Sequence, residues 1–326
     1  MITLHKLLSP ILIVSLCLAG SVAEAKKNKQ ADPAEGAPAK TALWPGLAPI
    51  AGGKTEKASS SIRVYHPEKP NGTAIVICPG GGYRAVYPQQ EGYPIGEWLN
   101  QHGITGILLD YRLPKGDATR PMSDVKRAIR TTRANAEKWG IDPNKIGIMG
   151  FSAGGHVAST AATQFDTGTA DAPDPVERVS SRPDFGILIY PVITMGEHSH
   201  GGSKRRLISD KASDELVKRY SSELQVTAQT PPCFLAHAKD DTAVVPKNSR
   251  MFAAALKAKG VSHRYLELPS GSHGLNGFKG PMWEAWKTQS LQWLDEQGFV
   301  PVANQSEAKP AVYSQDTGLV IWDDRS

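Results

Sequence analysis

The chain has 326 residues, of which 40% are hydrophobic and 21% charged, so it can bury a sizeable core as one large α/β domain or two small ones. The net charge is +5, but the basic residues are spread along the chain and form no basic face with interleaved aromatic residues. This pattern argues against nucleic acid as a partner.

The first 25 residues have the features of a secretory signal peptide. Leu7–Gly20 is an apolar stretch too short to span a bilayer, and Ala23-Glu24-Ala25 offers a small-x-small cleavage site. We therefore expect residues 1–25 to be removed during export, which leaves a secreted or periplasmic protein with no membrane attachment after signal cleavage. The alternative is an uncleaved membrane anchor. Residues 26–42 are polar, rich in alanine and proline and without periodicity, so we expect a flexible linker there.

Residues 43–300 alternate short apolar runs with helical patterns. Near-continuous apolar runs such as Ala74-Ile75-Val76-Ile77 predict strands buried on both faces, as in a parallel sheet covered by helices. The alternation predicts one catalytic domain of the α/β class, with a mostly parallel, doubly wound sheet flanked by helices. Residues 301–326 form a C-terminal tail, for which the sequence does not decide between a docked strand and a frayed end.

The expected elements follow in chain order. The predicted strands are Ile62–Tyr65, Thr73–Cys78, Ile104–Asp110, Lys145–Met149, Phe185–Tyr190, Cys233–His237 and Arg264–Leu268. The predicted helices are Glu91–Gln101, Ser123–Trp139, Ala153–Thr163, Asp210–Ser221, Pro246–Lys259 and Pro281–Glu296. Cys78 and Cys233 each lie in a predicted buried strand, so we expect free core thiols rather than a disulfide.

The strand Lys145–Met149 leads into Gly150-Phe151-Ser152-Ala153-Gly154, and a run of small residues follows. Strand, sharp turn and helix in this order present a serine hydroxyl at the edge of a sheet on a strained backbone. Glycines two residues before and after the serine are needed because the turn crowds its neighbours. The pattern predicts Ser152 as a catalytic nucleophile.

A serine hydroxyl needs a base within hydrogen-bond reach, and on this architecture the partners follow in the order Ser, acid, His. His273 lies in a Gly- and Ser-rich loop after the last predicted strand and is the predicted base. Asp240 and Asp241 follow the strand Cys233–His237, and either could supply the acid. We favour Asp241, in which case Asp240 is a turn residue.

The loop Pro79-Gly80-Gly81-Gly82-Tyr83 follows an early predicted strand. Bare glycine amides can approach a substrate oxygen closely, so we expect an oxyanion hole formed by the backbone amides of Gly81, Gly82 and Ala153. A triple glycine can also be a flexible turn or a phosphate-binding loop. The phosphate interpretation is weak because no Gly-Lys-Ser/Thr or Gly-x-Gly-x-x-Gly follows.

Short motifs between residues 43 and 274 resemble a known family when they are taken together. They are Leu43-Trp44-Pro45-Gly46, Cys78–Tyr83, Glu91-Gly92, Asp110-Tyr111-Arg112-Leu113, Gly150–Gly154, Pro231–His237 and Ser272-His273-Gly274. The chain resembles the α/β-hydrolase serine esterases of the acetyl xylan esterase-like family over roughly residues 43–299.

The resemblance implies a secreted carbohydrate esterase with Ser152 as nucleophile, His273 as base and the second member of the Asp pair as acid. Two departures stand out. Pro79 occupies a position where lipase-type relatives carry a histidine, and the spacing from the acid to the next proline is one residue longer than usual. The second departure leaves Asp240 and Asp241 as alternatives.

We expect two-step acyl transfer to water from an O-acetylated polysaccharide or its fragments, with no metal or organic cofactor. A feruloyl esterase or general carboxylesterase is the alternative within the same chemistry. A carbohydrate-binding protein that keeps the fold without turnover is the alternative of another class. The sequence does not predict the oligomeric state.

Overall fold

A computed structural model describes residues 36–300 together with residues 312–314 and 319–321. The predicted signal peptide (1–25), linker residues 26–35 and most of the predicted tail lie outside the described residues. In the two described tail segments, the backbone of β11 (Val312–Ser314) pairs antiparallel with that of β12 (Leu319–Ile321). Within the described ranges, no helix is long and apolar enough to cross a bilayer.

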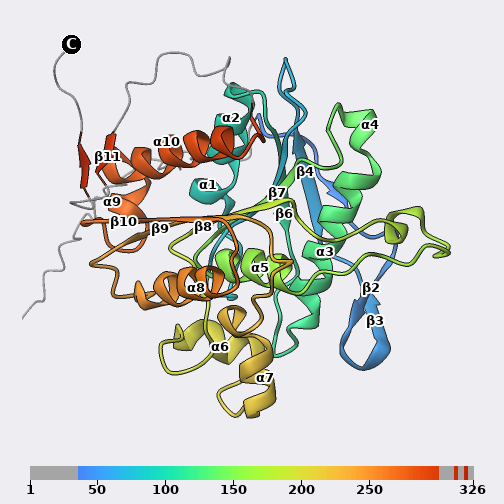
Figure 1. Cartoon of the computed structure of the whole chain (residues 1–326). Coiled ribbons are helices and arrows are strands. Elements are labelled where there is room, and N and C mark those ends of the chain that lie inside the picture. Colours follow the sequence, from blue (N-terminus) through green and yellow to red (C-terminus); the bar gives the residue numbers. More distant parts are fainter. Residues whose placement is uncertain (1–35, 301–311, 315–318, 322–326) are drawn as a thin grey trace, which may run out of the picture. The chain divides into compact units, whose positions relative to one another are not determined.

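The central sheet has eight strands (Figure 1). In spatial order they are β1 (Thr41–Ala42), β4 (Ser61–Tyr65), β6 (Thr105–Asp110), β5 (Ala74–Cys78), β7 (Ile146–Phe151), β8 (Phe185–Ile189), β9 (Cys233–Ala238) and β10 (His263–Leu268). β4 is antiparallel to β1 and β6, and the strands from β6 to β10 run parallel. This mostly parallel sheet confirms the predicted fold class, and each of the predicted strands is present with its ends within two residues of the prediction.

Helices cover both faces of the sheet (Figure 1). The helices on one face are α2 (Tyr93–Gln101) and α10 (Gly280–Glu296), and those on the other are α3 (Thr119–Ala134), α5 (Ser152–Thr163) and α8 (Lys247–Ala258). Alternate residues of β5 enter the two cores: Val76 and Cys78 pack with α3, α5 and α8, whereas Ile75 and Ile77 pack with α2 and α10. Burial on both faces explains why the strand reads as a continuous apolar run.

The shorter elements lie mainly in the connections. They are α1 (Pro88–Glu91), α4 (Ala136–Trp139), α6 (Gly201–Ile208), α7 (Asp214–Arg219), α9 (Leu275–Phe278), the 3-10 helices η1 (Ala51–Gly53), η2 (Pro175–Arg178) and η3 (Ser222–Leu224), and the hairpin strands β2 (Leu47–Ile50) and β3 (Lys54–Lys57). Thr41 and Ala42, which the sequence places at the end of the linker, form β1 and pair with β4.

Several helices differ from the prediction because glycine and local capping decide their boundaries. The predicted helix Glu91–Gln101 is interrupted at Gly92, whose backbone is not helical, so Glu91 ends α1 and α2 begins at Tyr93. α6 was not predicted because it begins with Gly201-Gly202, and glycine disfavours a helix by about 1 kcal/mol. The side chain of His200 compensates in part, since its Nδ1 accepts a hydrogen bond from the backbone amide of Ser203 at 3.2 Å.

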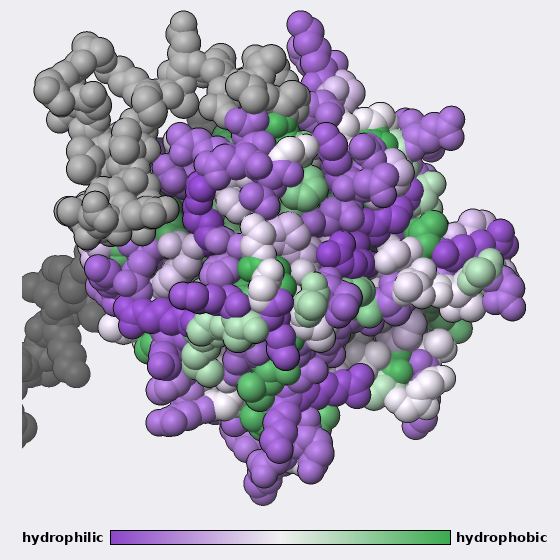
Figure 2. All heavy atoms as spheres, viewed as in Figure 1, coloured by the Kyte–Doolittle hydropathy of each residue, from purple (hydrophilic) through white to green (hydrophobic). Residues whose placement is uncertain are grey.

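On the face that Figure 2 shows, the surface is mostly hydrophilic, and hydrophobic residues occur in small groups. Two of the large hydrophobic residues that are most exposed, Leu47 and Leu224, lie far apart in the sequence, on the β2–β3 hairpin and in η3. Single exposed hydrophobic residues of this kind are normal for a folded domain.

Both described cysteines are buried in central strands. Cys78 ends β5 and Cys233 begins β9, and neither forms a disulfide, which confirms the expectation of free core thiols. Burial raises the pKa of the Cys233 thiol to about 12. The thiol is therefore protonated and unreactive at neutral pH.

A buried carboxylate ties two of the sequence motifs to the end of β6. Asp124 on α3 is fully buried and accepts hydrogen bonds from Trp44 Nε1 at 2.7 Å and from Arg112 Nη2 at 2.8 Å. Tyr111, next to Arg112, donates its hydroxyl to the carbonyl oxygen of Pro79 at 2.7 Å. The motifs around Trp44 and Arg112 thus stabilise the segment on which the glycine loop rests.

Candidate active site

The candidate site is built on the turn between β7 and α5. Ser152 follows the last residue of β7 and has φ of +53°, a strained conformation for a residue with a side chain. A Cβ atom at Gly150 would lie 2.2 Å from the carbonyl oxygen of Gly154, and one at Gly154 would lie 2.0 Å from that of Cys78. Only glycine fits at these two positions, which is the physical reason for the Gly-x-Ser-x-Gly pattern.

The structure brings three predicted residues from different loops into one hydrogen-bonded chain. Ser152 Oγ lies 2.8 Å from His273 Nε2, and His273 Nδ1 lies 2.7 Å from Asp241 Oδ2. Asp241 follows β9 and its side chain is fully buried, whereas His273 follows β10 and its side chain is 29% exposed. Because the carboxylate accepts from Nδ1, Nε2 is free to accept the proton of the serine hydroxyl.

The structure separates the roles of the two adjacent aspartates. Asp241 Oδ2 contacts the imidazole, and its Oδ1 accepts hydrogen bonds from the backbone amides of Ala243 and Val244, both at 2.9 Å. Asp240 instead accepts from the backbone amide of Ser272 at 2.8 Å. Asp240 therefore holds the loop that carries the histidine and does not contact the ring.

A second histidine contacts the carboxylate of Asp241. His237 is buried at the end of β9; its Nε2 lies 3.2 Å from Asp241 Oδ2, and its Nδ1 lies 2.8 Å from Ser249 Oγ. Burial alone would raise the pKa of Asp241, but the hydrogen bonds from His237 and His273 lower it well below its usual value. The carboxylate is therefore charged throughout the neutral range.

The glycine loop after β5 reaches the nucleophile. Gly81, Gly82 and Tyr83 have φ of +132°, +59° and +57°, and a Cβ atom at Gly81 would lie 2.1 Å from the carbonyl oxygen of Ala85. A Cβ atom at Gly80 would lie 2.9 Å from Ser152 Cβ, so the loop packs directly against the serine. Among the described residues, none accepts a hydrogen bond from the amides of Gly81 and Gly82, which leaves these two donors free.

The far end of this loop is anchored by a buried histidine on α5. Tyr83 Oη lies 2.8 Å from His156 Nδ1, and His156 Nε2 lies 2.7 Å from the carbonyl oxygen of Tyr220. Since a carbonyl only accepts, Nε2 carries the proton and Nδ1 accepts from the tyrosine hydroxyl. Burial lowers the pKa of His156 to about 4, so the ring is neutral at neutral pH.

We expect His156 to make the protein sensitive to acid. In the unfolded chain this ring gains a proton below about pH 6.5, whereas in the folded chain it stays neutral down to about pH 4. The free energy of unfolding should therefore fall by roughly 3 kcal/mol between pH 7 and pH 4 on account of this residue. Urea unfolding at several pH values gives this free energy for the wild type and for His156→Gln. It should depend less on pH in the variant, and the same pH dependence in both proteins would contradict this assignment.

Arg206 on α6 and His200, the residue before this helix, lie beside the glycine loop. His200 Cε1 lies 3.6 Å from the position of a Cβ atom at Gly82, and Arg206 Nη1 donates to the carbonyl oxygen of Gly82 at 3.2 Å. Burial lowers the pKa of His200, and the nearby positive charges of His273 and Arg206 lower it further. No sequence pattern pointed to Arg206, because α6 itself was not predicted.

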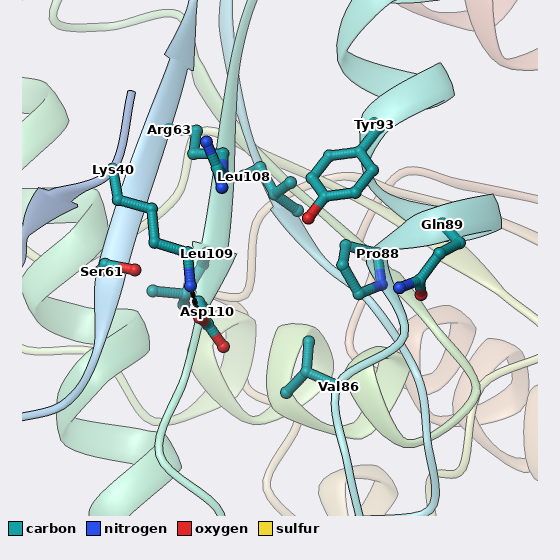
Figure 3. Close-up of a pocket in the computed structure, with 10 residues that line it drawn as sticks. All are labelled: Lys40, Ser61, Arg63, Val86, Pro88, Gln89, Tyr93, Leu108, Leu109 and Asp110. Carbon is teal, nitrogen blue, oxygen red and sulfur yellow. Dashed lines mark hydrogen bonds and ion pairs between the residues drawn. The ribbon is translucent and has the colours of Figure 1, made fainter. Parts of the chain in front are cut away.

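Two cavities lie next to the segment that follows the glycine loop. The first, of about 240 Å³, is at the carboxyl end of β6 (Figure 3). It is lined by Lys40, Ser61, Arg63, Val86, Pro88, Gln89, Tyr93, Leu108, Leu109 and Asp110. The second, of about 300 Å³, shares Val86 and Asp110 with the first. In Figure 3 the hydroxyl of Tyr93 points into the first cavity, and Lys40 reaches Asp110 at 2.6 Å.

The first cavity is linked to the nucleophile through the glycine loop. Tyr87, which lies between the lining residues Val86 and Pro88, donates its amide to the carbonyl oxygen of Gly80 at 3.1 Å, and Gly80 packs against Ser152. In the part of the chain that the structure describes, no group of three or more histidine, cysteine or acidic side chains is arranged to hold a metal ion.

Comparison with known proteins gives one family and several relatives. Residues 62–256 match the BD-FAE family. An acetylxylan esterase from Xylanibacter ruminicola is 39% identical over 74% of this chain and 48% of its own length. An endo-1,4-beta-xylanase B from Butyrivibrio fibrisolvens is 35% identical over 68% of this chain and 35% of its own length. The chain thus spans half or less of the length of these two relatives.

Solved structures share the whole domain. The acetyl ester-xyloside bifunctional hydrolase from Caldicellulosiruptor lactoaceticus aligns with a TM-score of 0.75 at 38% identity and covers 81% of this chain and 98% of its own. Esterase 2 from Thermogutta terrifontis, in a form phosphonylated by sarin, aligns with a TM-score of 0.67 at 24% identity over 82% of this chain and 96% of its own. At that identity the second match shows a shared fold.

Proposed function

The chain belongs to the BD-FAE family and has the α/β-hydrolase fold, and from this premise we propose that it is a serine esterase that removes acyl groups, chiefly acetyl groups, from polysaccharides or oligosaccharides. The observation that carries the proposal is the hydrogen-bonded chain from Ser152 through His273 to Asp241. In this arrangement the imidazole can remove the proton of the serine hydroxyl, which is otherwise a weak nucleophile.

The proposed mechanism has two steps. His273 Nε2 takes the proton of Ser152 as the oxygen attacks the ester carbonyl, and Asp241 stabilises the imidazolium that forms. The amides of Gly81, Gly82 and Ala153 donate to the oxyanion, and the imidazolium gives its proton to the departing sugar oxygen, which leaves as a hydroxyl. Water, activated by the same imidazole, then cleaves the acyl-serine. Each proton transfer uses a side chain of this protein.

A carbohydrate substrate is supported by the relatives and by the cavities. The names of three similar proteins refer to acetylxylan, xylan or an acetyl ester and a xyloside. The first cavity offers an aromatic ring and hydroxyl at Tyr93 and an amide at Gln89, groups suited to the faces and hydroxyls of a pyranose. We propose that the sugar chain next to the ester lies over the glycine loop and in this cavity. Export, for which residues 1–25 provide the support, would bring the protein to such substrates.

Replacing Tyr93 with alanine should separate glycan binding from chemistry. We expect kcat/KM for acetylated xylo-oligosaccharides to fall roughly tenfold, mainly through KM, because a stacking and hydrogen-bonding partner is lost. Hydrolysis of 4-nitrophenyl acetate, which carries no sugar, should change by less than about twofold. Tyr93→Phe isolates the contribution of the hydroxyl. Equal losses on both substrates, or none on the oligosaccharide, would show that the cavity does not bind the sugar.

A panel of esters tests which acyl group the protein prefers. The proposal predicts turnover of 4-nitrophenyl acetate well above that of the butyrate and octanoate esters and of methyl ferulate. Preference for methyl ferulate or for the longer esters would favour a feruloyl esterase or a general carboxylesterase. No turnover of any ester, without labelling of Ser152 by a fluorophosphonate, would favour a carbohydrate-binding protein.

A further inference from the structure

A second buried carboxylate lies next to the nucleophile, and the proposed mechanism does not use it. Glu91 is the last residue of α1 and is 7% exposed. Its Oε2 accepts a hydrogen bond from the backbone amide of Gly80 at 2.6 Å, and its Oε1 accepts one from Tyr190 Oη at 2.8 Å. One side chain therefore joins the loop after β5 to the loop after β8.

The contact with Gly80 leads to the serine. A Cβ atom at Gly80 would lie 2.8 Å from Glu91 Oε2, 2.9 Å from Ser152 Cβ and 3.0 Å from the carbonyl oxygen of Phe151. The backbone of Gly80 thus fills the space between the carboxylate and the nucleophile. The next two residues carry the amides that we assign to the oxyanion hole, so the hydrogen bond from the amide of Gly80 to Glu91 fixes the start of that loop.

The contact with Tyr190 leads to the imidazole. The ring of Tyr190 lies 4.8 Å from that of His273 between centroids, tilted by 59°. Tyr190 has φ of +37°, and its amide donates to the carbonyl oxygen of Ala236 at 2.7 Å. A bulky residue keeps such a backbone only where its surroundings hold it, and the hydrogen bond to Glu91 is one of the contacts that do.

The charges around Glu91 single out His273 as its electrostatic partner. Burial raises the pKa of Glu91, whereas the amide of Gly80, the hydroxyl of Tyr190 and the charge of His273 act in the opposite direction. Burial also raises the pKa of Tyr190 well above its usual value, so this phenol stays neutral and donates. The other titratable groups that face this region are Tyr111, Asp241, His237 and His200. Among the described residues, no lysine or arginine forms an ion pair with Glu91.

We infer that Glu91 is a positioning residue: it fixes the glycine loop through Gly80 and the imidazole through Tyr190, and its negative charge favours the imidazolium of His273. This inference rests on the proposed serine esterase function. Acyl transfer creates the imidazolium while the oxyanion forms, so one carboxylate would support both developing charges through the two groups that it holds.

The test is Glu91→Gln, which keeps the size and one acceptor oxygen but removes the charge. With 4-nitrophenyl acetate we expect kcat to fall roughly 10- to 100-fold with KM within about twofold, since the loss falls on the transition state. Without the carboxylate the imidazole is harder to protonate. The acidic limb of the profile of kcat/KM against pH should therefore move to lower pH by roughly half a unit or more.

Two further variants serve as controls. Tyr190→Phe keeps the ring against His273 but removes the hydroxyl, so we expect a several-fold loss of kcat without movement of the acidic limb. Glu97→Gln changes an exposed carboxylate on α2 and should alter neither readout. If Glu91→Gln does not fold, the kinetics of Tyr190→Phe decide, and wild-type kinetics in that variant would overturn the inference.

The inference can fail independently of the proposed function. An NMR titration of His273 in the wild type and in Glu91→Gln follows the imidazole whether or not any ester is turned over. A midpoint that moves to lower pH in the variant supports the inference. The inference is overturned if neither the midpoint of the His273 titration nor kcat changes in the variant. It is also overturned if kcat falls while the midpoint and the acidic limb stay where they were. Absence of wild-type turnover would instead overturn the esterase function.

Discussion

Replacing Ser152 with alanine is expected to lower kcat for 4-nitrophenyl acetate by roughly 10⁵-fold or more, the size of loss seen when the nucleophile of a serine hydrolase is removed. The substitution deletes the oxygen that lies 2.8 Å from His273 Nε2 and no packing atom. The fold should therefore persist, with a midpoint of thermal unfolding close to that of the wild type. Steady-state kinetics and calorimetry on the same preparations provide both readouts.

The matched control is Ser159→Ala on the same helix. Ser159 is fully buried, and its hydroxyl lies 2.8 Å from Ser222 Oγ. Loss of this hydrogen bond should cost about 1 kcal/mol of stability and leave kcat within about twofold of the wild type. If Ser152→Ala retained more than about a thousandth of the wild-type kcat, or if both variants lost activity equally, Ser152 would not be the nucleophile.

Replacing Asp241 with asparagine is expected to lower kcat by roughly 10⁴-fold, because an amide can donate to His273 Nδ1 and stabilise the wrong tautomer of the ring. The hydrogen bonds from His237 and His273 keep the pKa of Asp241 well below its usual value. A carboxylate whose pKa is lowered by folding is charged at all pH values above its ordinary range. Loss of this charge also makes the imidazole harder to protonate, so the acidic limb of the profile of kcat/KM against pH should move to lower pH in Asp241→Asn, and the loss of kcat is compared on the plateau above that limb.

Asp240→Asn supplies the comparison for Asp241. This side chain accepts from the amides of Gly271 and Ser272 and does not contact the imidazole. Because asparagine retains one acceptor oxygen, we expect less than about a tenfold loss of kcat. The reverse order of effects, with the larger loss at Asp240, would assign the acid to the other aspartate and contradict the geometry described above.

The order of the chain accounts for much of what could be predicted. The apolar run before Gly150 and the small residues after Gly154 define the turn locally, and His273 lies where a base would follow the last strand of such a domain. Parallel strands bring the loops at their carboxyl ends to one edge of the sheet, so residues 121 apart in the sequence are brought within 2.8 Å. Periodicity and strand order were sufficient to predict that Ser152 and His273 lie side by side.

The two aspartates show where sequence alone is insufficient. Asp240 and Asp241 share the same local pattern, and the direction of each side chain depends on the turn that follows β9. The amides of Ala243 and Val244 orient Asp241 inward, whereas Asp240 faces the loop before His273. The spacing from the acid to the next proline is one residue longer than in the family, so the family pattern did not predict the shape of this turn.

The residues that sequence reasoning missed make contacts between elements whose pairing is not local. Glu91 bonds to Tyr190, 99 residues away, and appeared in the sequence only as part of a family motif. Arg206 approaches the glycine loop on a helix that begins with two glycines. His237 looked like the end of a buried strand, which it is, but its ring also reaches Asp241. Burial and tertiary contact decide these roles, and neither is encoded in a local pattern.

In the proposed function, Ser152 removes acetyl groups from a glycan. The most direct test measures acetate release from acetylated xylo-oligosaccharides by the wild type and by Ser152→Ala at equal concentrations of folded protein. We expect steady release by the wild type and none above background by the variant. Equal release by both proteins would contradict the role of Ser152, and no release by a wild type that hydrolyses 4-nitrophenyl acetate would contradict the proposed substrate.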